Sequence, residues 1–182
     1  MRDLASPHAL GAASGPNDRH RAGTDAAARP AVDPADDAAT LAARSFHTGR
    51  SLPFPPEGVY GAFADARLLA AWWGPEGFRN VFEHFAFHEG GDWRFTMHGP
   101  DGRSWANHNR FLRLQPGREV TIRHESVPRF TLQVTLQAEA EGTRLTWQQV
   151  FDEVETALAV RDLVLPANEQ NLDRLTRVLA GA

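Results

Sequence analysis

Between residues 78 and 151 the chain alternates apolar and polar residues in six consecutive segments, which are separated by turns containing glycine or proline. The clearest segment is Phe130–Ala138, where Phe, Leu, Val, Leu and Ala alternate with Thr and Gln. A period of two places every second side chain on the same face of a β-strand. Six successive strands joined by short turns predict an antiparallel sheet with one apolar face.

Patterns on either side of this region complete the predicted fold. Residues 46–52 alternate as a first strand that stops at Pro53, and two short helices begin near Pro55 and at Asp65. The chain ends in a helical pattern with leucines spaced by seven, at Leu158, Leu165, Leu172 and Leu179. Pro166 predicts a bend in this helix or two abutting helices. We therefore expect an α+β fold in which a sheet of six or seven strands packs on a long amphipathic helix.

The composition changes near residue 43. All 5 Trp, all 11 Phe and the single Tyr lie beyond that point, whereas residues 1–43 are rich in Ala, Pro and Asp. Too few large apolar side chains remain in the first segment to offset the entropy lost on ordering. We expect a disordered extension over residues 1–43 and one domain over residues 44–182. Without a secretory signal or an apolar run long enough to span a membrane, we expect a cytoplasmic protein.

The charged and sulfur-containing residues exclude several classes of function. The chain has no Cys, which excludes disulfides and thiol nucleophiles, and its 19 basic residues are all Arg, which excludes a Schiff-base lysine. A net charge of -4 argues against a nucleic-acid partner. Of the 8 His residues, His84 and His88 are four apart, but four residues on a strand span about 13 Å, too far for one metal ion. We predict no metal and no cofactor.

Three stretches carry a resemblance to a known family: Ala71–Phe78 reads AWWGPEGF, Gly90–Gly102 reads GGDWRFTMHGPDG, and Asn168–Leu175 reads NEQNLDRL. They resemble the SRPBCC, or START-like, helix-grip superfamily, and more narrowly its activator of heat-shock protein 90 ATPase homologue-like branch. The resemblance covers about residues 45–180. It implies a curved antiparallel sheet wrapped around the C-terminal helix, two short helices after the first strand, and a cavity between sheet and helix.

Large side chains on the strand faces expected to meet the helix are candidates for the cavity wall. They are Phe85, Phe87, Trp93, Phe95, Met97, Phe130 and Trp147, with Trp73 at the mouth. Val81 shares the predicted face of Phe85 and Phe87. The same aromatic residues would also fill a solid core, and the sequence leaves both interpretations open. Polar residues on apolar faces are candidate ligand anchors, because burying one without a partner destabilises the fold. They are His124, Gln149, Arg161 and Asn168.

These residues support three hypotheses about function. The first is binding of a small hydrophobic molecule in the cavity. The second is an interaction module like the chaperone activator, with a protein partner or a second copy of the chain. The third is an enzyme of the cyclase or hydrolase kind that uses His124 or His98 as an acid or base. No G-x-S-x-G motif, Gly-rich phosphate loop or other catalytic motif occurs in the sequence, which favours binding over catalysis.

Overall fold

A computed structural model describes residues 34–181, which form four helices and seven strands. In chain order they are α1 (Pro34–Ala43), β1 (Ser45–Leu52), α2 (Pro56–Ala64), α3 (Ala66–Trp72), β2 (Arg79–Phe85), β3 (Asp92–His98), β4 (Ser104–Gln115), β5 (Glu119–His124), β6 (Phe130–Glu139), β7 (Gly142–Phe151) and α4 (Val154–Ala180). The predicted order of a strand, two short helices, six strands and a long helix is confirmed.

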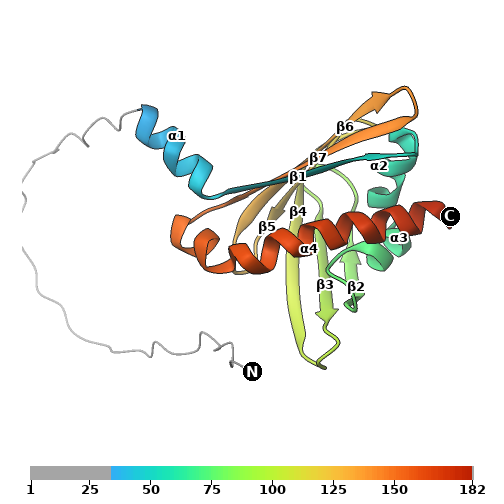
Figure 1. Ribbon diagram of the computed structural model, residues 1–182. Coiled ribbons are helices and arrows are strands. Elements are labelled where there is room, and N and C mark those ends of the chain that lie inside the picture. Colours follow the sequence, from blue (N-terminus) through green and yellow to red (C-terminus); the bar gives the residue numbers. More distant parts are fainter. Residues whose placement is uncertain (1–33, 182) are drawn as a thin grey trace, which may run out of the picture. The chain divides into compact units, whose positions relative to one another are not determined.

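All seven strands form one antiparallel sheet in the order β1-β7-β6-β5-β4-β3-β2. Strands β2 to β7 follow the chain as a meander, whereas β1 pairs with the last strand, with Phe46 opposite Gln149. The sheet is curved and α4 runs across one of its faces, with α2 and α3 between β1 and β2 (Figure 1). The predicted α+β class and curved antiparallel sheet are confirmed.

Local chemistry explains where the short helices begin. Pro55 is the N-cap of α2 and Pro56 its first residue, positions where the missing N–H of proline has no intrahelical acceptor. Asp65 caps α3 because its side chain accepts hydrogen bonds from the backbone N–H groups of Arg67 and Leu68, at 2.7 and 3.1 Å. This is the cap that the sequence predicted.

The structure differs from the sequence prediction at the start of the domain. Residues 34–43, expected in the disordered extension, form helix α1, while residues 1–33 lie outside the described residues. The segment reads PADDAATLAA, and alanine has the highest helix propensity. A segment with too few large apolar residues to form its own core can therefore still form a helix next to the core of the domain.

The prediction of which β2 side chains point inward is also wrong for one residue. Val81 is 43% exposed, whereas Phe82 and Phe85 pack against the core. A register shift between Phe82 and His84 explains the error, because a bulge reverses which alternate side chains point inward.

Helix α4 is continuous from Val154 to Ala180 and contains Pro166, so the two abutting helices do not occur. Its buried residues are Ala157, Asn168, Asn171, Leu172 and Leu175. Leu158, predicted to share the buried stripe with Leu172, is 57% exposed. A straight helix drifts by about 20° per seven residues, so a heptad of leucines leaves the buried face after two repeats.

The core fills most of the space between the sheet and the helices. The main cluster joins α2, α3 and α4 to the inner sheet face, through residues such as Phe63, Trp72, Trp93 and Leu172. A smaller cluster of Phe46, Phe151 and Ala157 lies under the first turns of α4. The space between α4 and the middle of the sheet, however, is not completely filled.

Candidate functional site

A cavity of about 230 Å³ lies between α4 and the inner face of the sheet. Its wall combines apolar rings, aliphatic side chains and polar residues of three kinds: Asn, His and Gln. The lining residues are Trp73, Gly74, Pro75, Phe95, Met97, Asn107, His124, Phe130, Leu132, Trp147, Gln149, Val164, Ala167, Asn168 and Asn171.

The cavity brings together eight of the residues predicted for it from the sequence: Trp73, Phe95, Met97, His124, Phe130, Trp147, Gln149 and Asn168. They come from the α3–β2 loop, β3, β5, β6, β7 and α4. Alternation along the strands explains why they meet, since each strand contributes the residues of its inner face.

Three predicted wall residues lie elsewhere. The rings of Phe85, Phe87 and Trp93 pack around Phe111, with centroids 5.7, 5.0 and 6.0 Å from it. Phe111 is fully buried on β4, a strand whose inner face the sequence did not resolve. At this end of the sheet the aromatic residues form the solid core that was the alternative interpretation.

Arg161 does not face the cavity either. It is exposed on α4, and its guanidinium carbon lies 5.6 Å from the ring centroid of Phe46. The prediction assumed that Arg161 and Asn168, seven residues apart, point the same way, but the buried stripe follows the helical period instead. Arg161 thus packs outside the cavity by a cation–π contact.

His124 is the one titratable residue in the cavity wall, and its ring is held from two sides. Its Nδ1 lies 2.7 Å from Asn109 Oδ1, and its ring stacks on Phe130 with centroids 4.6 Å apart. Asn109 stands directly opposite His124 in the β4–β5 register. Burial, with smaller contributions from Arg123 and His108, lowers the pKa of His124 to about 4. The imidazole is therefore neutral at pH 7.

A second polar pair joins α4 to the sheet across the cavity. Asn168 Nδ2 donates to Gln149 Oε1 over 3.0 Å, and both residues are 5% exposed. This hydrogen bond uses only one polar atom of each side chain, so Gln149 Nε2 and Asn168 Oδ1 have no partner within residues 34–181. His124 Nε2 likewise has none, because the contact with Asn109 uses only Nδ1. None of these three atoms is among the fully enclosed unpartnered groups, so each keeps some accessible surface, and the residues that carry them line the cavity.

The loop that closes one side of the cavity is fixed to α4 by its backbone. Arg174 donates to the carbonyl oxygens of Ala71, Gly74 and Pro75 over 2.7, 2.9 and 2.6 Å. Asn171 Oδ1 accepts from the Gly74 N–H at 2.6 Å. Two of the three stretches that carry the family resemblance, AWWGPEGF and NEQNLDRL, therefore bind each other.

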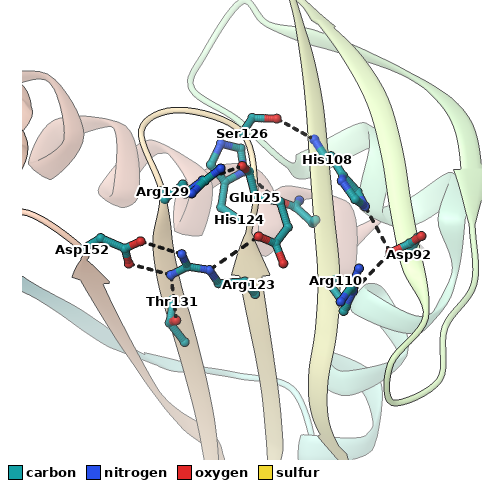
Figure 2. Close-up of polar contacts among 11 residues, drawn as sticks. Asp92, His108, Arg110, Arg123, His124, Glu125, Ser126, Arg129, Thr131 and Asp152 are labelled. Carbon is teal, nitrogen blue, oxygen red and sulfur yellow. Dashed lines mark hydrogen bonds and ion pairs between the residues drawn. The ribbon is translucent and has the colours of Figure 1, made fainter. Parts of the chain in front are cut away.

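Charged residues gather on the opposite face of the sheet and in the loops beside it (Figure 2). His108 Nε2 and Arg110 Nε both contact Asp92 Oδ1, at 3.0 and 3.4 Å. The hydrogen bond from His108, helped by Arg110, lowers the pKa of Asp92. Arg123 binds Asp152 through two contacts of 2.6 Å. The sequence did not predict these networks, because they pair residues of different strands.

The other acid–base and metal candidates do not assemble in the structure. His98, the other histidine considered as an acid or base, contacts Ser104 Oγ through Nδ1 at 2.7 Å and does not line the cavity. His84 lies on β2 and His88 in the loop after it. Within residues 34–181, no group of three or more His, Asp or Glu side chains is placed to hold a metal ion.

The family described as Activator of Hsp90 ATPase homolog 1-like protein matches residues 53–180. The chain belongs to this family. Membership supports a ligand-binding or activator-like role and confirms the resemblance read from the three stretches. No curated protein matches the chain.

Solved structures share the helix-grip fold of this family. A Chromobacterium violaceum protein is 27% identical with a TM-score of 0.66, and the match covers 75% of this chain and 96% of that one. A Nitrosomonas europaea protein is 17% identical with a TM-score of 0.70, covering 77% and 96%. An AHSA1-like protein from Aeromonas hydrophila is 16% identical with a TM-score of 0.63, covering 75% and 92%. Among the described helices, none is both long and apolar enough to cross a membrane.

Proposed function

We propose that the protein binds a small, largely apolar molecule in the cavity between the sheet and α4. The observation that carries this proposal is a set of polar atoms on wall residues that no hydrogen bond within residues 34–181 pairs, among them His124 Nε2, Gln149 Nε2 and Asn168 Oδ1. Most polar groups inside a structural core are paired, because leaving one unpaired is unfavourable. Within the described residues only Asn80 Oδ1, Trp93 Nε1, Asn109 Nδ2 and Trp147 Nε1 are fully enclosed without a partner. A cavity with mostly apolar walls and a few converging polar groups is typical of a ligand site.

The volume limits the size of the ligand. An engineered cavity of about 150 Å³ lined by apolar residues binds benzene. A cavity of about 230 Å³ therefore has room for one ring with a few further atoms. Larger lipids or polycyclic molecules would require α4 or the loop after α3 to move.

The chemistry of the wall favours binding over catalysis. Among its lining residues there is no Ser, Thr, Tyr, Asp or Glu, so His124 has neither a nucleophile nor a second acid–base group beside it in the cavity. An imidazole with a pKa of about 4 is also a weak base at neutral pH.

An activator-like interaction with a protein is the second candidate function. Trp105 is 42% exposed at the start of β4, and its ring lies 5.7 Å from that of Phe78. The exposed Trp105 and the half-buried Phe78 together form an aromatic surface that a partner protein can cover.

Toluene is a suitable first probe, because it fits the volume and because Trp73 and Trp147 of the wall report binding through their fluorescence. We expect saturable binding and a raised melting temperature. Ala167→Leu should fill the cavity from α4 and abolish binding while the protein stays folded. Ala159→Leu, the same change at an exposed position of α4, is the matched control and should bind like the wild type. Absence of saturable binding to folded wild-type protein would overturn the proposal.

A further inference from the structure

We infer that the ligand of this cavity is an uncharged molecule bearing a hydroxyl group, of the phenol or small alcohol class. This inference rests on the proposed function, and it goes further by naming the ionic state and the polar group of the ligand.

The first argument is the charge of the wall. No Asp, Glu, Lys or Arg lines the cavity in the described part of the chain. The one ionisable wall residue, His124, is buried beside Asn109 and is neutral at pH 7. Arg123, next to His124 in sequence, pairs with Asp152. A carboxylate, phosphate or ammonium ion in this cavity would be buried without a counter-ion, which is strongly unfavourable.

The second argument is the pattern of unpaired atoms. Because Asn109 Oδ1 accepts from His124 Nδ1, the neutral ring carries its proton there and presents Nε2 as an acceptor. Asn168 Oδ1 is a second acceptor, and Gln149 Nε2 is a donor. Asn107 Oδ1 is a further unpaired acceptor, whereas the unpaired Trp147 Nε1 is enclosed and not accessible. The wall residues therefore offer acceptors and, at Gln149 Nε2, an accessible donor to a ligand.

A hydroxyl group matches this pattern. It donates one hydrogen bond and accepts two, so it can donate to His124 Nε2 or Asn168 Oδ1 while it accepts from Gln149 Nε2. A carboxylate can only accept hydrogen bonds, so its oxygens would face the lone pairs of His124 Nε2 and Asn168 Oδ1. A hydrocarbon would leave these two atoms and Gln149 Nε2 without a hydrogen-bond partner. The rings of Phe95, Phe130 and Trp147 then cover the apolar part of the ligand.

Matched pairs of ligands test the inference on the wild-type protein by tryptophan fluorescence and calorimetry at pH 7. Benzamide and benzoate have nearly the same shape, as do benzyl alcohol and benzylammonium, and the members of each pair differ in charge and in one hydrogen-bonding group. We expect the neutral member to bind at least about 100-fold more tightly. Phenol and toluene test the hydroxyl group, and phenol should bind at least as tightly although water solvates it better.

Variants identify the atoms responsible. In His124→Phe and in Gln149→Leu, each checked for folding by circular dichroism, the ratio of phenol to toluene affinity should fall by about tenfold. The Ala159→Leu control should keep the wild-type ratio.

The outcomes separate the inference from the proposed function. Binding of benzoate or benzylammonium within about threefold of its neutral partner would overturn the inference and leave the binding function standing. An unchanged phenol-to-toluene ratio in both folded variants would overturn the role of the hydroxyl group. Failure of every probe to bind would overturn the proposed function itself.

Discussion

The interior of this protein has two parts that differ in how they are filled. Beside β2, β3 and β4, the rings of Phe82, Phe85, Trp93 and Phe111 contact one another at centroid distances of 5.3 to 6.2 Å. Between α4 and β5, β6 and β7, similar aromatic side chains surround a cavity of about 230 Å³. The number of aromatic residues therefore does not decide whether a core is solid.

The polar residues mark the difference between the two parts. In the aromatic part, the one buried amide opposite the rings is Asn109, which pairs with Trp93 in the β3–β4 register and whose side chain contacts His124 at the edge of the cavity. In the cavity part, His124 and Gln149 on the inner face of the sheet and Asn168 on α4 all line the cavity, and Asn168 donates to Gln149 across it. A buried polar residue on an apolar strand face is thus the better indicator of a site.

The largest expected effect comes from breaking the aromatic part. Trp93 is 0% exposed, and Trp93→Ala should lower the free energy of unfolding by about 3–5 kcal/mol, because a cavity would replace the ring. Urea unfolding measures this loss. Trp105→Ala, at a residue that is 42% exposed, is the control and should cost less than about 1 kcal/mol. A cost below about 1 kcal/mol at Trp93 would show that this part is not solid.

In the cavity part, His124 should make the free energy of unfolding depend on pH. The pKa of His124 falls from 6.5 to about 4 on folding, so the unfolded chain binds the proton more readily. The contribution of neutral His124 to the free energy of unfolding is nearly complete above pH 6.5 and is lost as the pH falls toward 4. Between pH 7 and pH 5 this lowers the free energy of unfolding by about 2 kcal/mol.

Urea unfolding at pH 7 and pH 5 measures this change. His124→Phe should remove most of it, while the carboxylates with lowered pKa, such as Asp92, lose their contribution only at lower pH. Equal pH dependence of the variant and the wild type would show that His124 is not responsible.

A smaller effect concerns the pair that crosses the cavity. Asn168→Leu and Gln149→Leu each remove one partner of the 3.0 Å hydrogen bond, and the double variant removes both. A double-mutant cycle from chemical unfolding should give a coupling energy of about 1 kcal/mol. Additive losses would mean that the two amides do not stabilise each other.

The smallest effect is expected outside both parts. Arg161→Ala removes only a cation–π contact with Phe46 and should lower the free energy of unfolding by about 0.5–1 kcal/mol. Toluene affinity should stay at the wild-type value, because Arg161 does not line the cavity. A clear loss of toluene affinity would show that Arg161 contributes to the binding site.

The sequence predicted the sheet well because alternation is a local property of each strand. It failed at Val81 and Leu158, where a bulge and the drift of a heptad along α4 decide which side chains point inward. It also missed Asn109, since the pairing with His124 depends on the register between β4 and β5, which shifts at Phe111 and Arg113. Long-range register therefore limits what the sequence reveals about the site.

The bonds of Arg174 have a consequence for how this family varies. Its three acceptors are the main-chain carbonyl oxygens of Ala71, Gly74 and Pro75, which any residue at those positions would supply. Substitutions in the loop therefore need no compensating change at position 174, and statistical co-variation between the two segments should be weak although they touch. Lysine cannot replace the arginine well, because an ammonium group lacks the planar fork that reaches several carbonyls at once.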